Sequence, residues 1–258
     1  MSVNTYLQGL GSSLVLSSTE KASISVSVDT IKSRLTSYFG EEVTEKKLYG
    51  SYVRETILPR KADERSDVDL MVVFKNPYMY KPQSFLNRLK SFAEYYYSQS
   101  EIHQSSPTIV LELNHIMFEL TPAYMTNYGM YYIPKNSSEW MYTDPDGFYS
   151  KLTECNKNNS YKIKPVVRIL KHWNIQKNYR DLASYELEKK IAEELMYAYY
   201  SCTSYTDYLK HALGKIKYST DYSRVNKALD CIDEALRLET EGYPYSAENK
   251  IKEAFPEV

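Results

Sequence analysis

The stretch from Tyr49 to Phe74 places the strongest constraint on what this chain can be. It reads YGSYVRETILPRKADERSDVDLMVVF, opening with a Gly-Ser pair and ending in Asp67-Val-Asp69 followed by five apolar residues. Side chains alternate between the two faces of a strand, so both aspartates would leave this strand on one face. Converging carboxylates are the ligands that Mg²⁺ prefers in proteins. The sequence therefore predicts a metal site at the start of a buried strand.

The Gly-Ser pair precedes this strand and suggests a phosphate site. Gly50 allows close backbone approach, Ser51 offers a hydroxyl, and amides at a helix N-terminus would attract an anion. We expect a helix through residues 53–58 and a loop at Pro59. Taken singly, a Gly-Ser pair is usually a turn and an Asp-x-Asp is often solvated. Their order along the chain favours nucleotide chemistry.

The combined pattern resembles the signature of the polymerase-beta-type nucleotidyltransferases, an apolar-Gly-Ser followed after a spacer by Asp-apolar-Asp-apolar. This resemblance implies an α+β fold, in which a core of mixed sheet and helices is followed by a helical lobe. The active site is expected in the cleft between them. We expect a catalytic lobe over residues 1–150 and a helical nucleotide-binding lobe over residues 151–258. The loop-rich stretch 128–159 would form the crossing.

Periodicity gives a coarse map of the other elements. Apolar residues at helical spacing predict helices over residues 24–39, 81–98, 164–174, 184–201 and 223–238, and one starting near residue 246. Two runs of β character, 108–113 and 115–121, are separated by Asn114 and predict a hairpin.

A third carboxylate is expected on the second strand of this hairpin. The segment MFELTPAY resembles the third-acid strand of the same nucleotidyltransferases, which implies that Glu119 is a metal ligand. Those enzymes usually carry Asp there, so Glu is a departure. A salt-bridged or exposed strand residue is the alternative, because a buried carboxylate needs a partner. Glu112 on the preceding strand is the second candidate for the third ligand.

Two segments of the second lobe extend the resemblance. VVRILKHWN and LASYELEKK are similar to the substrate-binding lobe of oligoadenylate synthetase and of the bacterial CD-NTases, relatives of cyclic GMP-AMP synthase. The resemblance implies that Lys171 and Ser184 contact the triphosphate and that Tyr185 stacks on the donor base. Ser184 also reads as a helix N-cap. A solvated lysine, a helix cap and a core tyrosine are the simpler readings.

The first motif departs from the family at one residue. Members commonly read G-S-x-x-R-G-T, whereas this chain has GSYVRET, with Glu55 in the glycine position. Arg54 and Thr56 keep their places and are assigned to substrate binding with Gly50 and Ser51. The charge of Glu55 would be unfavourable near a triphosphate unless its side chain points away.

The composition of the chain limits the kinds of partner that we expect it to bind. The chain has 258 residues and a net charge of −1, so no strong positive field favours long duplex nucleic acid. The first residues lack the basic region and apolar run of a signal peptide, and no membrane partner is expected. We expect a cytoplasmic protein that acts on small nucleotides.

These observations lead to one main functional hypothesis. Asp67, Asp69 and Glu119 would hold two Mg²⁺ ions, with Mn²⁺ as a substitute, and join NTPs or dNTPs into a cyclic or linear oligonucleotide. The resemblance implies a signal in bacterial anti-phage defence, read by a responsive effector protein. A toxin that modifies a tRNA end or a protein hydroxyl is the alternative, and a non-catalytic binding module is a third. Near-neutral charge argues against tRNA, and the intact Asp67-Asp69 pair argues against the third.

Overall fold

The computed structural model describes residues 1–76, 78–105 and 107–258, which form two compact units. The first comprises Met1–Val15, Glu55–Glu64 and Phe148–Val258, and the second comprises Leu16–Arg54 and Arg65–Gly147. The expected division at residue 150 differs from this in three segments, because residues 1–15, 55–64 and 148–150 belong with the C-terminal helices.

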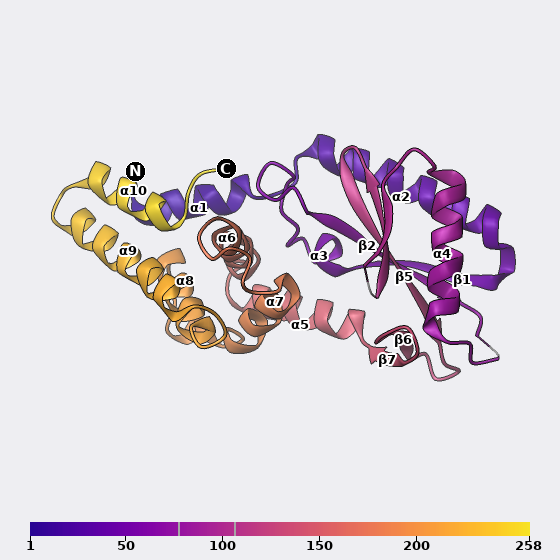
Figure 1. Ribbon diagram of the computed structural model, residues 1–258. Coiled ribbons are helices and arrows are strands. Elements are labelled where there is room, and N and C mark those ends of the chain that lie inside the picture. Colours follow the sequence, from indigo (N-terminus) through magenta and orange to yellow (C-terminus); the bar gives the residue numbers. More distant parts are fainter. Residues whose placement is uncertain (77, 106) are drawn as a thin grey trace. The chain divides into compact units, whose positions relative to one another are not determined.

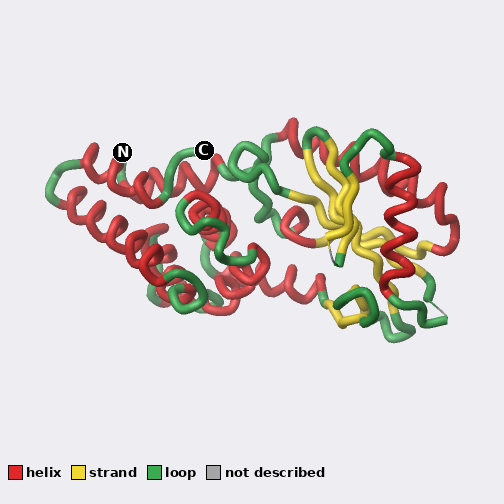
Figure 2. Tube along the Cα trace, viewed as in Figure 1, coloured by secondary structure: helices red, strands yellow, loops and turns green. Residues whose placement is uncertain are grey.

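The second unit is built on a sheet whose strands appear in yellow in Figure 2. Strand order is β1-β2-β5-β4-β3, with β6 paired to β5 and β7 to β6. Only β2 and β5 are parallel among the described pairs, so the sheet is mixed as predicted. The strands are β1 (Val43–Tyr49), β2 (Asp67–Phe74), β3 (Ile102–Ser105), β4 (Thr108–Leu113), β5 (Ile116–Met125), β6 (Tyr131–Pro134) and β7 (Trp140–Thr143).

Two helices, α2 (Ser18–Phe39) and α4 (Pro82–Tyr96), cover one face of this sheet (Figure 1). Phe74 of β2 packs against Phe39 at 5.1 Å and Phe85 at 4.9 Å between ring centroids. By alternation, Val68 faces the same helices. Asp67 and Asp69 therefore leave β2 on the opposite face.

The first unit consists of helices and connecting loops, with no strand among its described residues. Its elements are α1 (Val3–Ser13), most of α5 (Pro145–Asn158), α6 (Ile163–Gln176), α7 (Ser184–Glu194), α8 (Tyr205–Ile216), α9 (Tyr222–Thr240) and α10 (Pro244–Ala254). Residues 166–174 of α6 are all buried, which makes α6 the central helix. The first and last helices are joined, since the Tyr6 hydroxyl donates to the Phe255 carbonyl at 2.6 Å.

Several expected elements need correction. The stretch 128–159 is not loop-dominated, because it contains β6, β7 and α5. The helix expected through residues 53–58 is instead the four-residue α3 (Gly50–Val53), capped by Arg54. The helix expected over 184–201 ends at Glu194, with a 3₁₀ turn at Ala198–Tyr200. The predicted hairpin of β4 and β5 is confirmed.

Candidate active site

Three carboxylates occupy one face of two neighbouring strands. In the parallel pairing of β2 with β5, Asp69 lies opposite Glu119 and Asp67 lies opposite Met117. Neighbouring strands are about 4.8 Å apart, so Asp69 and Glu119 are adjacent and Asp67 is one step along the same face. All three side chains are half-buried. The structure thus brings together the three residues that the sequence assigns to metal.

The electrostatics of this face are those of an anionic site. Burial, and then the charge of Asp67, raise the pKa of Glu119 to about 7, against a hydrogen bond with Thr108 that lowers it. Burial and the charges of Asp69, Glu119 and Asp67 likewise raise the pKa of Tyr49, despite its hydrogen bond with Thr121. A bound cation would relieve this mutual repulsion.

Glu119→Gln should therefore change how stability depends on pH. The native protein holds the Glu119 proton more tightly than the unfolded chain, so this carboxyl destabilises the metal-free protein as pH rises from 4.5 to about 7. We expect the variant to lose that decline, and to lose Mg²⁺-induced stabilisation at pH 8. Thermal unfolding with and without Mg²⁺ across pH 4.5–8 measures both. Were Glu119 only a strand residue, the variant would keep the full response to Mg²⁺.

Tyr49 is a site residue that the sequence analysis missed. It lies opposite Asp69 in the β1–β2 pairing, in one row with Asp69 and Glu119, and its hydroxyl is 2.7 Å from Thr121 Oγ1. In the sequence, Tyr49 looks like an ordinary apolar residue before Gly50. Only the register between β1 and β2 shows that it lies beside Asp69.

Position 50 requires glycine for two reasons, its backbone conformation and the lack of room for a side chain. Its φ is +72°, in the left-handed region that favours glycine, and a Cβ there would lie 1.6 Å from Oδ2 of Asp69. Helix α3 starts at Gly50, so Ser51 follows this contact directly. The Gly-Ser turn and the aspartate strand, 17 residues later in the chain, are thus in contact.

Glu55, at the position where the family commonly has glycine, adopts a backbone conformation that favours glycine. Glu55 has φ +60°, a conformation that costs a non-glycine residue about 1–2 kcal/mol. Its carboxylate pairs with Lys164 at 2.7 Å, and its carbonyl accepts from Arg168 at 2.8 Å. The charge that would oppose a triphosphate is therefore paired with a lysine. Arg54 and Thr56 beside it are buried.

Lys171 is buried and ion-paired. It is 5% exposed, its ammonium pairs with the fully buried carboxylate of Glu188, and it donates to the Thr56 carbonyl at 3.2 Å. Contact of Lys171 with a triphosphate stays a prediction, and the structure adds a stabilising role for this side chain.

The start of α7 differs from expectation. Ala183 is the N-cap, with no side-chain cap, and Ser184 is the first helical residue, so the N-cap prediction for Ser184 is wrong. Tyr185 is 48% exposed and its ring meets Phe148 edge-on, with centroids 5.3 Å apart. A half-exposed ring held by a second ring is suited to stacking.

Tyr185→Ala should weaken donor nucleotide binding by roughly ten- to a hundredfold, because stacking contributes about 1–3 kcal/mol per base. The maximal rate should change less, as expected when binding is lost equally from ground and transition states. Tyr185→Phe should be nearly silent. Steady-state KM and kcat measure this, and equal damage by Phe and Ala would assign the role to the hydroxyl.

Glu112, the second candidate for the third ligand, belongs to another group. It lies on β4 opposite Met117, one strand further from Asp67. Its carboxylate gathers with Glu101 and His103, and the ligand atoms of the three lie within 4.8 Å of one another. This geometry favours Glu119 over Glu112 as the partner of the aspartates.

Comparison with known proteins adds to this geometry. Residues 1–156 match the Second Messenger Oligonucleotide or Dinucleotide Synthetase domain. The chain belongs to this family. The match spans the carboxylates of β2 and β5, and it confirms the resemblance to the CD-NTase group that the motifs predicted.

One curated relative is a cyclic AMP-AMP-AMP synthase from Acinetobacter sp. (strain ATCC 27244 / 9458), 26% identical over 159 residues. The alignment covers 58% of this chain and 46% of that protein, so the chain spans about half the length of its curated relative.

Two solved structures show the same fold. The cyclic dinucleotide synthase CdnE of Elizabethkingia meningoseptica, with GTP and Apcpp, has a TM-score of 0.67 and 21% identity, covering 86% of this chain and 88% of that one. CdnC of E. coli MS115-1, in complex with HORMA-deltaN, has a TM-score of 0.71 and 11% identity, covering 98% and 97%. The predicted α+β class with a helical part is confirmed. Among the described helices, none is long and apolar enough to cross a membrane.

Proposed function

We propose that this protein is a metal-dependent, template-independent nucleotidyltransferase that joins NTPs or dNTPs into a cyclic or linear oligonucleotide and releases pyrophosphate. The observation that carries the proposal is the row of Asp67, Asp69 and Glu119 on one face of β2 and β5. The contact of Gly50 with Asp69 ties the phosphate motif to that row.

The donor set fits two Mg²⁺ ions. All three ligands are hard carboxylate oxygens. Burial, and then the charge of Asp67, raise the pKa of Glu119, and a bound cation would favour the ionised carboxylate. Bound divalent metal would supply Lewis acidity at the α-phosphate and at an acceptor hydroxyl. Asp67, Asp69 and Glu119 would supply the carboxylate oxygens that hold this metal.

The other assigned residues orient the donor. The amide and hydroxyl of Ser51, reached through the Gly50 turn, bind a phosphate oxygen, and Arg54 and Thr56 support this segment. Lys171 and Ser184 bind the β and γ phosphates, and Tyr185 stacks on the base. Fixing the triphosphate so that pyrophosphate leaves in line lowers the barrier through orientation and charge stabilisation.

The relatives suggest the product class and partner. The Acinetobacter protein is a cyclic AMP-AMP-AMP synthase by name, and CdnE was solved with GTP and a nucleotide analogue. Cyclic trinucleotide or dinucleotide products are therefore the first to seek here. The complex of CdnC with HORMA-deltaN supports the expectation that this chain also has a partner protein. NTP substrates would place the reaction in the cytoplasm.

The test is incubation of the purified protein with each labelled NTP and dNTP plus Mg²⁺ or Mn²⁺, followed by chromatography before and after phosphatase and nuclease. Phosphatase-resistant small products would support cyclic oligonucleotide synthesis. Label retained on protein or on added RNA would indicate a modifying enzyme instead. If no product forms with any nucleotide, with or without an added partner protein, the chain would instead be a binding module without catalytic activity.

Asp67→Asn and Asp69→Asn should abolish turnover in this assay. Each change removes one ligand charge, while relief of repulsion should leave thermal stability unchanged or slightly raised. Product formation and unfolding temperature are the measurements. Near-wild-type turnover in either variant would remove that aspartate from the metal site.

A further inference from the structure

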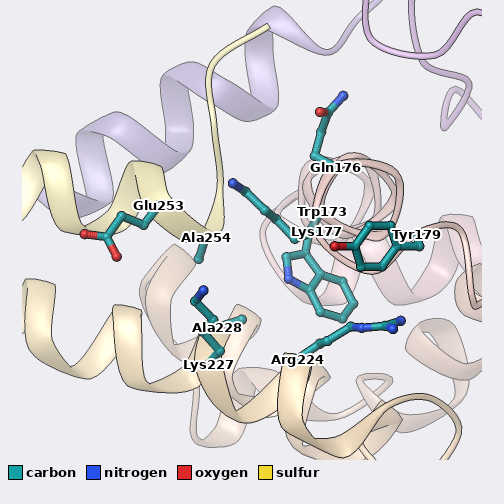
Figure 3. A pocket seen from close by; sticks show the side chains of 9 residues that line it. All are labelled: Trp173, Gln176, Lys177, Tyr179, Arg224, Lys227, Ala228, Glu253 and Ala254. Atoms are coloured by element: carbon teal, nitrogen blue, oxygen red, sulfur yellow. The ribbon is translucent and has the colours of Figure 1, made fainter.

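A cavity of about 370 Å³ lies within the helical unit, at the C-terminal end of α6. Trp173, only 1% exposed, forms part of its wall, and the small side chains of Ala228 on α9 and Ala254 on α10 leave room beside it (Figure 3). Small-molecule sites commonly have volumes of roughly 300–1,000 Å³. The cavity is therefore large enough for more than a simple anion.

The lining carries unbalanced positive charge. Arg224 pairs with Asp221 at 3.3 Å, and the lining carboxylate of Glu253 pairs with Lys250 at 2.9 Å. Lys177 and Lys227 also line the cavity, and neither has a carboxylate partner in the part of the chain that the structure describes. Figure 3 shows these two lysines reaching toward the same side of the cavity from α9 and from the end of α6. Two uncompensated cations match one phosphate monoester, which carries about −1.5 to −2 charges at neutral pH.

The loop after α6 is held in an unfavourable backbone conformation. Tyr179 and Arg180 have φ values of +55° and +58°, and consecutive left-handed residues are costly for non-glycine side chains. Fully buried Asn178 anchors this loop by donating to Asn174 and to Thr220, each at 2.8 Å. These hydrogen bonds hold the loop in one position despite its unfavourable backbone conformation.

That position presents a planar surface at the cavity wall. Tyr179 is 79% exposed, and the guanidinium of Arg224 lies 4.7 Å from its ring centroid. Arg224 also donates to the Asn178 carbonyl at 3.3 Å, which fixes the pair to the loop. A ring and a guanidinium plane are the surfaces on which nucleobases stack.

We propose that this cavity binds a phosphorylated ligand of nucleotide size, with its phosphate between Lys177 and Lys227 and its base beside Tyr179 and Arg224. None of these residues is assigned to catalysis. The site is therefore a second nucleotide site, and its existence does not depend on the proposed activity.

Trp173 gives the test a local probe, because the chain has two tryptophans and the other, Trp140, lies in β7. In a Trp140→Phe chain with EDTA present, titration with AMP, inorganic phosphate and adenosine should change Trp173 emission. We expect saturable binding of AMP, weaker binding of phosphate, and the weakest of adenosine. Calorimetry with AMP on the unsubstituted chain provides the same comparison without the Trp140 change.

Lys177→Ala/Lys227→Ala should weaken AMP binding at least tenfold, with an unchanged unfolding temperature. Lys157→Ala/Lys215→Ala removes two lysines of the same unit from outside the cavity lining and serves as the charge-matched control. Equal weakening in both double variants would reduce the effect to general electrostatics and overturn the proposal. The proposal would also be overturned if AMP caused no saturable change in Trp173 emission. Tighter binding of a short polyglutamate peptide than of AMP would overturn it too.

Discussion

Gly50→Ala is expected to reduce turnover to the level of Asp69→Asn. The added methyl would lie 1.6 Å from Oδ2 of Asp69, far inside contact distance, so the carboxylate or the turn must move. Because the same turn carries Ser51, the change would displace the proposed metal ligand Asp69 and the proposed phosphate ligand Ser51 together. The left-handed φ adds about 1–2 kcal/mol of destabilisation. Turnover, Mg²⁺ affinity and unfolding temperature are the measurements.

Gly129→Ala is the matched control. Gly129 has φ +77°, close to that of Gly50, but a Cβ there would meet nothing within 4 Å. This variant should lose similar stability from backbone strain and keep its activity. Equal loss of activity in both variants would mean that strain alone, and not the clash with Asp69, disables the protein.

Lys171→Ala is expected to destabilise the helical unit by about 3–5 kcal/mol, the typical result of removing one partner of a buried ion pair. The change leaves the fully buried Glu188 carboxylate without its lysine. Lys164→Ala is the control on the same helix. The carboxylate that it leaves behind, on Glu55, is largely exposed and can be solvated, so we expect a loss of only about 0–1 kcal/mol. Denaturant unfolding measures both.

A double variant separates stability from substrate binding. Lys171→Met/Glu188→Leu replaces both charges with apolar groups and should recover most of the lost stability. If Lys171 also binds the triphosphate, the recovered protein will still show a raised KM for NTP. A stable double variant with normal KM would restrict Lys171 to its structural role.

The parts of the fold that sequence predicted are those where one local pattern decides the outcome. The run DVDLMVVF has the length and apolar character of a buried strand, and in the β4–β5 hairpin the residues after the turn, at the start of β5, alternate between buried and half-buried. Asp67 and Asp69 share a face because alternation fixes side-chain direction within a strand, and Glu119 joins them through the pairing of β5 with β2. What alternation leaves open is the register between strands, and this is why Tyr49 was missed.

The errors occurred where tertiary contacts override local preference. Residues 53–58 look helical, but the backbone turns left-handed at Glu55, where Arg168 and Lys164 hold it. The Pro- and Asn-rich stretch after residue 128 forms two short strands because β5 offers an edge for β6 to pair with. Ser184 has the composition of an N-cap, yet the helix starts one residue earlier than that role requires.

The division into units could not be read from the order of elements. Leu7 and Leu10 of α1, with Leu58 and Ala62 of the 55–64 segment, belong to the same core as Trp173. Nothing local marks these residues as partners of helices more than a hundred positions away. Their apolar character predicts burial, but not the unit in which they are buried.

The bond between Tyr6 and the Phe255 carbonyl has a consequence for synthesis of the protein. A chain emerging from the ribosome presents the apolar side of α1 long before the helices that cover it, α6, α8, α9 and α10, have been made. Until then, Val3 and Leu7 remain available to chaperones or to other nascent chains. The sheet unit, whose residues all lie between 16 and 147, can fold while the rest is still being made. We expect synthesis stalled before residue 244 to yield a folded sheet with an unfinished, aggregation-prone helical remainder.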